Sequence, residues 1–280
     1  MATQKKFNIR CDLEGVSGVV RPVQSDPSKP EYSQTCEWFM EELLAMIEGL
    51  YDGGATEVVV YDEHWFGTNI DMARLPRGVK AICGKPPYQP NWAGGIDSSF
   101  AGYILHGFHS MEGTGHLLAH TYEPDFKAIR LNGVKMGEIG MESAIAGDWG
   151  VPLVMITADD KGVEEAQKLI PGVVGVATKI SRALHGGECF ALEDNCAKIY
   201  RAAAAVAEKL PAVKPYKLKG AAHFEADYFD GPYVETLRKM FPKLFIKKNT
   251  ICIEAKTATA AWAKLWQCKL AVQAELAKNA

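Results

Sequence analysis

The chain has 280 residues, of which 48 % are hydrophobic and 23 % charged, which is typical of a folded globular protein and argues against disorder. Its 31 basic and 34 acidic residues give a net charge of −3 and are dispersed along the chain, so we expect no nucleic-acid partner. No run approaches the roughly 18–20 apolar residues of a membrane span, so we expect no membrane partner. Seven cysteines without a C-x-x-C motif indicate reduced thiols and a cytoplasmic protein.

Strand and helix patterns alternate through the first 210 residues. Residues 7–13 alternate between apolar and polar side chains, which predicts a strand. Residues 57–61 (Glu-Val-Val-Val-Tyr) are apolar after the first, like strands buried in parallel sheets. We expect further strands at 103–105 and 153–157, a hairpin at 125–136 around the turn Asn132-Gly133, and helices at 37–51, 138–148, 160–169 and 191–210. This order predicts an α/β main domain with three layers around a mostly parallel sheet.

A proline-punctuated linker at 211–215 precedes the last part of the chain. Beyond it the pattern predicts strands at 216–228 and 244–254 and helices at 231–240 and 257–277. We therefore expect an α/β domain over 1–212 and a smaller α+β subdomain over 213–280. The last predicted helix carries a stripe that indicates core packing, with an oligomer interface as the alternative: Trp262, Leu265, Trp266 and Leu270.

Three common catalytic or nucleotide-binding motifs are absent from the sequence. Gly15-Val-Ser-Gly18 approaches a nucleophile elbow, but Val19 stands where that motif requires glycine. No G-x-G-x-x-G follows a predicted strand, and no Walker A motif is present. Dinucleotide and nucleoside-triphosphate binding are therefore not indicated, and we interpret Ser17 as a turn residue.

Acidic and histidine side chains follow several of the predicted strands. Asp12 and Glu14 end the first strand, and their i, i+2 spacing places both carboxylates on one side. His64 follows the second strand, His109 follows the third, and Glu138 comes after the hairpin at the start of a helix. Because ligands gather outside the carboxyl ends of strands in open α/β sheets, we expect these five side chains to lie close together.

Carboxylates this close would repel one another unless a cation lay among them. Mixed imidazole and carboxylate ligation is typical of Zn²⁺, Mn²⁺ or Fe²⁺. Five ligands exceed the three of a mononuclear catalytic zinc site and suit two metal ions that share a carboxylate, an arrangement that favours hydrolysis. Taken singly, each residue is more often a helix cap, a turn residue or a hydrogen-bonded surface group, and only their joint placement predicts a metal site.

The remaining candidates have simpler interpretations. Asp62 either orients a ligand imidazole or caps a turn, two equally good readings of its position. His106 is expected to pack at a strand end. His185 and His223 are interpreted as surface residues.

The spaced motifs resemble those of the binuclear-zinc D-aminopeptidases, a family of metallopeptidases first associated with a dipeptide-transport operon. The segments that carry the resemblance, in order, are 12–18 (Asp-Leu-Glu-Gly-Val-Ser-Gly), 61–64 (Tyr-Asp-Glu-His), 107–109 (Gly-Phe-His), His120, 137–140 (Gly-Glu-Ile-Gly), 158–160 (Ala-Asp-Asp) and 170–173 (Ile-Pro-Gly-Val). The resemblance therefore extends over most of the chain.

The resemblance implies that two Zn²⁺ ions per subunit, or Mn²⁺, Co²⁺ or Fe²⁺ in their place, are bound by Asp12, Glu14, His64, His109 and Glu138. It also implies that His120 is the catalytic histidine and not a ligand. Its role as nucleophile, proton shuttle or electrostatic stabiliser is left open. Because members of the family release N-terminal D-amino acids from short peptides and form a ring-based decamer, we expect a short-peptide substrate and a homo-oligomer.

Two other functions fit the same residues. One is a metal-dependent hydrolase that acts on another amide or on a cyclic imide. The other is a non-catalytic module that binds metal ions or peptides. In the segment between His109 and His120, Glu112 and His116 add ionisable groups that bear on substrate preference.

Overall fold

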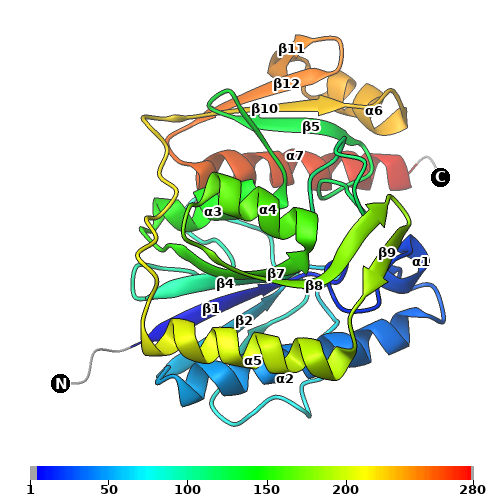
Figure 1. Cartoon of the computed structure of the whole chain (residues 1–280). Coiled ribbons are helices and arrows are strands. Elements are labelled where there is room, and N and C mark those ends of the chain that lie inside the picture. The colour runs from blue at the N-terminus through cyan, green and yellow to red at the C-terminus, as the bar shows by residue number, and fades with distance from the viewer. Residues whose placement is uncertain (1–4, 279–280) are drawn as a thin grey trace.

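The larger of two β-sheets has seven strands in the order β3-β2-β1-β4-β7-β8-β9 (Figure 1). The structure is a computed structural model that describes residues 5–278. The strands of this sheet are β1 (Lys6–Cys11), β2 (Glu57–Asp62), β3 (Lys80–Ile82), β4 (Gly102–Phe108), β7 (Leu153–Asp159), β8 (Val174–Ala183) and β9 (Gly186–Cys189). Neighbouring strands are parallel, apart from the antiparallel pair β8 and β9. β1 therefore lies inside the sheet, between β2 and β4.

Helices cover both faces of this sheet (Figure 1). α2 (Tyr32–Asp52) and α5 (Leu192–Glu208) lie together on one face, and α3 (Glu138–Asp148) and α4 (Asp160–Leu169) lie on the other. The short helix α1 (Pro22–Ser25) precedes α2. Among the residues that the structure describes, no helix has both the length and the apolarity needed to cross a membrane. The predicted three-layer α/β architecture around a mostly parallel sheet is confirmed.

A second, antiparallel sheet has five strands in the order β11-β12-β10-β5-β6. Its strands are β5 (Phe126–Leu131), β6 (Val134–Met136), β10 (Ala222–Tyr228), β11 (Phe245–Lys247) and β12 (Thr250–Ala255). The accompanying helices are α6 (Pro232–Met240), the 3₁₀ helix η1 (Pro242–Leu244) and α7 (Ala258–Ala277). Because β5 and β6 precede residue 212, this α+β unit contains strands from both sides of the predicted boundary. The division into 1–212 and 213–280 stays a prediction.

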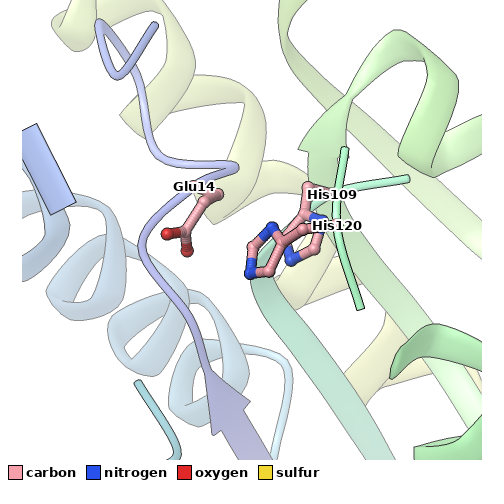
Figure 2. Close-up of side chains that lie close together, drawn as sticks. All are labelled: Glu14, His109 and His120. Atoms are coloured by element: carbon pink, nitrogen blue, oxygen red, sulfur yellow. The ribbon is translucent and has the colours of Figure 1, made fainter. Parts of the chain in front are cut away.

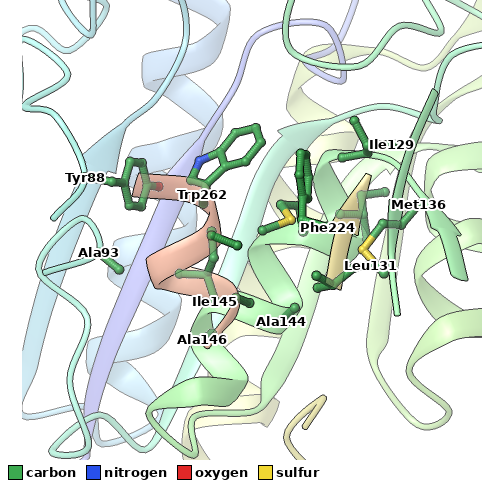
Figure 3. Close-up of a cluster of buried hydrophobic side chains, with 14 of the residues drawn as sticks. Tyr88, Ala93, Ile129, Leu131, Met136, Ala144, Ile145, Ala146, Phe224 and Trp262 are labelled. Carbon is green, nitrogen blue, oxygen red and sulfur yellow. The ribbon is translucent and has the colours of Figure 1, made fainter. Parts of the chain in front are cut away.

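Trp262 of α7 is central to the apolar core between the two sheets (Figure 3). Its side chain is 1 % exposed, and its ring packs edge-on against Phe224 of β10 with the ring centroids 6.0 Å apart. Leu265 is also buried, whereas Leu270 is 44 % exposed. Core packing is therefore confirmed for the first part of the predicted stripe and does not extend to its end.

Three strands, β3, β8 and β9, lie in segments without a predicted strand. β3 and β9 are short, and β8 contains Thr178 and Lys179, polar residues that are buried because their side chains donate to backbone carbonyl groups. β10 begins at Ala222, later than predicted, and a turn at Lys248-Asn249 divides the predicted strand 244–254 into β11 and β12. Side-chain periodicity therefore predicts the long apolar elements better than short or polar strands.

Gly107 allows β4 to approach the loop that follows β1. Its φ of +74° lies in the left-handed region, which favours glycine. A Cβ atom at this position would lie 2.1 Å from the carbonyl oxygen of Asp12. The Gly15 N–H donates to the Gly107 carbonyl oxygen across the same gap, at 2.7 Å. The loop that carries Asp12 can therefore pack on β4 only where the strand has no side chain.

We expect Gly107→Ala to lower the free energy of unfolding by at least about 1–3 kcal/mol, because the substitution combines an unfavourable φ with a backbone clash. Denaturant unfolding measures this effect. Gly186→Ala is the matched control, since a Cβ atom at Gly186 meets no atom within 4 Å. We expect that variant to stay within about 0.5 kcal/mol of the wild type, and equal losses in both variants would contradict the steric argument.

Candidate metal centre

Three carboxylates and two imidazoles converge outside the carboxyl edge of the larger sheet. Asp12 and Glu14 lie in the loop after β1, His64 follows β2, His109 follows β4, and Glu138 is the first residue of α3. The strand order places β2 and β4 on opposite sides of β1, so a topological switch point lies between β1 and β4. Loops diverge at such a point and leave a crevice in which ligands bind. The structure thus brings together all five residues selected from the sequence, and each is buried.

Asp12 belongs to two groups of potential metal ligands. One group is Asp12, Glu14 and His64, and the other is Asp12, His109 and Glu138; the donor atoms of each group lie within 4.8 Å of one another. Asp12 Oδ1 is 2.7 Å from His64 Nδ1, whereas Asp12 Oδ2 is 3.3 Å from His109 Nε2. The two oxygens of the Asp12 carboxylate therefore face different ligand groups.

Backbone carbonyl groups determine which ring nitrogens carry protons. His64 Nε2 is 2.7 Å from the Ser25 carbonyl oxygen, and His109 Nδ1 is 3.0 Å from the Ser110 carbonyl oxygen. Because a carbonyl oxygen only accepts, the nitrogen that faces it donates a proton. The other nitrogen of each ring, His64 Nδ1 or His109 Nε2, is then directed at the carboxylates, as in a metal-ligating histidine.

The cluster requires positive charge at its centre. Glu14 Oε2 and His109 Nε2 are buried without a hydrogen-bond partner among residues 5–278. Burial by itself lowers the pKa of His109, but Glu138 and Asp12 raise it well above its ordinary value. For His64, Glu14 and Asp12 likewise outweigh burial and raise the pKa. Protons or metal cations meet this requirement, and the mixed nitrogen and oxygen donors fit Zn²⁺ or a similar transition-metal ion.

Glu138 is ionised although it is buried. It begins α3, where the helix dipole favours negative charge, and its Oε1 accepts the Tyr122 N–H at 2.6 Å. Burial raises the pKa of Glu138, but His109, His120 and this N–H lower it to about 2. The carboxylate is therefore available as a ligand at neutral pH.

His120 lies at the rim of the cluster. Its ring stacks on that of His109, with centroids 4.0 Å apart and planes 9° from parallel, and Figure 2 shows Glu14 opposite the stacked pair. His120 Nδ1 is 2.9 Å from the Leu118 carbonyl oxygen, so Nε2 points to the cluster, 3.7 Å from Glu138 Oε1. The side chain is 35 % exposed, in contrast to the five buried residues. His120 is therefore the imidazole of the cluster that a solvent-borne molecule can reach.

A buried network of charged side chains lies next to the cluster. Arg10 of β1 is completely buried, and its guanidinium donates to Glu142 of α3 and, at 2.8 Å, to Glu63 Oε1. Burial and Glu142 raise the pKa of Glu63 to about 8, against the opposing charge of Arg10. The Tyr122 hydroxyl donates to Glu142 Oε1 at 2.8 Å. The network therefore connects β1 and α3 to the segment that carries His120.

A second buried cation holds the loop after β1. The Lys179 ammonium donates to the carbonyl oxygens of Glu14, Val16 and Val19, each at 2.6 Å. Burial lowers the pKa of Lys179 to about 8, and the three carbonyl groups match its three donors. The backbone of the candidate ligand Glu14 is thereby fixed by β8.

Sequence motifs do not reveal these two cations. Arg10 looks like the solvent-facing residue of an alternating strand, and Lys179 lies in a segment without a predicted strand. Helices cover both faces of the sheet and bury both residues. Arg10 shares the alternation of its strand with the polar Asn8 and Asp12, so no signal in the sequence marks it as buried.

The other predicted candidates lie outside the cluster. Asp62 accepts the backbone and side-chain N–H groups of Asn69, each at 2.6 Å, and thus holds the loop after β2. His106 is completely buried and stacks on Phe39 with centroids 5.4 Å apart, and burial lowers its pKa to about 4. A neutral, packed His106 confirms the interpretation from the sequence.

The fold and this cluster together define an α/β protein with a carboxylate and imidazole centre at its switch point. The chain belongs to the D-aminopeptidase family, peptidase family M55, whose model matches residues 6–266. Over 181 residues it is 30 % identical to a D-aminopeptidase of Bacillus subtilis (strain 168), a match that covers 64 % of this chain. The match spans 65 % of the length of that relative.

A solved structure shares the fold. It is the Zn-dependent D-aminopeptidase DppA from Bacillus subtilis, described as a self-compartmentalizing protease, with a TM-score of 0.87 and 24 % sequence identity. The superposition covers 96 % of each chain. The similarity therefore extends through both sheets.

We expect Arg10→Met to lower the free energy of unfolding by about 3–5 kcal/mol, because it leaves Glu63 and Glu142 buried without their cation. Denaturant unfolding at matched metal content measures the loss. Arg74→Met is the control: Arg74 pairs with the exposed Glu37 and Glu41, so its loss is expected to cost no more than about 1 kcal/mol. Similar losses in the two variants would show that the buried network contributes no more to the free energy of unfolding than an exposed ion pair.

Proposed function

We propose that the protein is a zinc-dependent aminopeptidase that removes N-terminal D-amino acids from short peptides or amides. The observation that carries this proposal is the position of Asp12, whose two oxygens face separate ligand groups. Membership of the D-aminopeptidase family supports the reaction, and the Zn-dependence of the structural relative supports the metal.

Each ligand group would hold one ion. The first is Asp12, Glu14 and His64, and the second is Asp12, His109 and Glu138. The chain would then hold two ions that share one carboxylate, as in other hydrolases with two metal ions. Mn²⁺, Co²⁺ and Fe²⁺ accept the same nitrogen and oxygen donors and are the alternatives to zinc.

When bound, zinc supplies Lewis acidity toward a peptide carbonyl and lowers the pKa of water. Proton transfer and positioning are carried out by side chains of the protein. The protonated Nδ1 of His120 donates a hydrogen bond to the Leu118 carbonyl oxygen, so Nε2 is the atom that can hold or move a proton at the reacting bond. The stacking on His109 and the Tyr122 contacts limit the movement of this ring. His120 is thus the catalytic residue of the proposal.

The proposal includes a homo-oligomer in the cytoplasm. The structural relative is described as self-compartmentalizing, which supports an assembly that encloses the active sites, and we propose a ring-based decamer for this chain. All seven cysteines are free thiols, which is compatible with a reducing compartment.

Metal content tests the shared ligand. We expect about two zinc ions per wild-type chain, about one in His64→Ala, and close to none in Asp12→Ala, since only Asp12 serves both ions. Elemental analysis of dialysed protein measures the ratio. His185→Ala, which removes an exposed histidine, is expected to keep the wild-type value. Equal metal content in the Asp12 and His64 variants would rule out a bridging carboxylate.

Substrate preference tests the reaction. We expect the zinc-loaded protein to release the first residue of D-aminoacyl dipeptides faster than that of their L counterparts, and chelation to abolish the release. Chromatography of the free amino acids measures both rates. Preference for another amide or an imide would indicate a different amidohydrolase, and tight metal binding without any hydrolysis would indicate a binding module.

His120→Ala separates catalysis from metal binding in the same assay. We expect turnover to fall at least about a hundredfold, the range of general acid–base catalysis, while metal content stays unchanged. A parallel loss of metal would identify His120 as a ligand, which its position beside Glu14 and His109 also permits geometrically.

A further inference from the structure

A second cluster of metal-type side chains lies on the antiparallel sheet, apart from the proposed catalytic residues. His223 and Glu225 are on β10, and Cys252 and Glu254 are on the neighbouring strand β12. The register pairs His223 with Glu254 and Glu225 with Cys252, so the four side chains form a two-by-two patch on one face of the sheet. Their positions are therefore set by backbone pairing between two strands.

Three donor atoms of this patch lie close enough together to share one ion. Cys252 Sγ is 3.7 Å from His223 Nδ1 and 3.9 Å from Glu254 Oε1. Zinc–nitrogen bonds of about 2.0–2.1 Å and zinc–sulfur bonds of about 2.3 Å place nitrogen and sulfur about 3.6 Å apart in a tetrahedron. Cys252 Sγ is also 3.8 Å from His223 Nε2, so the thiol lies over the face of the ring. The donor atoms of the three residues already lie within 4.8 Å of one another, and side-chain rotation would direct them at one ion.

The fourth residue occupies the supporting position of such a site. His223 Nε2 is 3.2 Å from Glu225 Oε1, while Nδ1 faces Glu254. A metal-ligating histidine typically donates its second ring N–H to a carboxylate in this way. Arg130, opposite Glu225 on β5, forms an ion pair with Glu225, with its Nη1 3.6 Å from Glu225 Oε2.

Charge and access also favour a cation. The side chains of His223 and Glu254 are 44 % and 67 % exposed, so an ion reaches them from solvent. Within residues 5–278, no lysine or arginine forms an ion pair with Glu254. A thiol, an imidazole and a carboxylate together select a thiophilic divalent cation over Mg²⁺ or Ca²⁺.

We propose that His223, Cys252 and Glu254 bind one zinc-like divalent cation, with Glu225 as the carboxylate that orients His223. The ion would join β10 to β12 on the outer face of the second sheet. This site is independent of the proposed aminopeptidase activity, because it shares no residue with the Asp12 cluster, that is, Asp12, Glu14, His64, His109 and Glu138.

Cobalt titration of the metal-free full-length protein tests the proposal. Co²⁺ bound to a thiolate has an intense near-ultraviolet charge-transfer absorption, and the Asp12 cluster contains no sulfur ligand. We expect this absorption to saturate at one thiolate-bound ion per chain and to resist an excess of Mg²⁺. Cys252→Ser is expected to lack the absorption and to bind one Co²⁺ fewer than the wild type.

The matched control is Cys189→Ser, which removes an exposed thiol from β9 and is expected to behave as the wild type. Glu225→Gln keeps all three ligands and is expected to weaken the thiolate-bound Co²⁺ about 10–100-fold, the typical effect of losing such a supporting carboxylate. Absence of the absorption in the wild type, or its persistence in Cys252→Ser, would overturn the proposal. These outcomes do not depend on whether the protein hydrolyses peptides.

Discussion

The position of Asp12 depends on backbone contacts at the end of the sheet. Its N–H donates to the His106 carbonyl oxygen at 2.8 Å, and its own carbonyl group lies against Gly107. The carboxylate is thus held by β1 and β4 and not by a free loop. His64 and His109, on either side, meet different oxygens of this one group. The geometry of both ligand groups therefore follows from how two parallel strands end.

Burial of so many acids carries a desolvation cost, and the fold offsets it with cations placed inside the sheet. Arg10 faces Glu63 and Glu142 below the cluster, and Lys179 satisfies three carbonyl groups of the loop after β1. Both cations come from strands whose two faces are covered by helices. The helices that exclude water from the larger sheet thus also bury the two cations that position the candidate ligands.

Much of this arrangement could be predicted from sequence because it depends on local patterns. The helices 138–148 and 160–169 and the buried strand at 57–61 follow from periodicity, and the convergence of Asp12, Glu14, His64, His109 and Glu138 follows from the rule for strand ends. The contacts of Arg10 and Lys179 could not be predicted, because each joins residues more than 50 positions apart in the chain. The Cys252 patch depends in the same way on strand register, which the sequence does not reveal for a sheet built from separated segments.

The five residues of the Asp12 cluster come from four segments spread between positions 12 and 138. Joining segments this far apart costs chain entropy before any ligand contact forms, so the cluster is complete only after β1, β2, β4 and α3 have assembled. The unfolded chain has no equivalent site, and an ion bound there stabilises the native state alone, in proportion to the logarithm of its free concentration. The concentration of free metal in the cell would in this way change the fraction of unfolded protein and its rate of proteolysis.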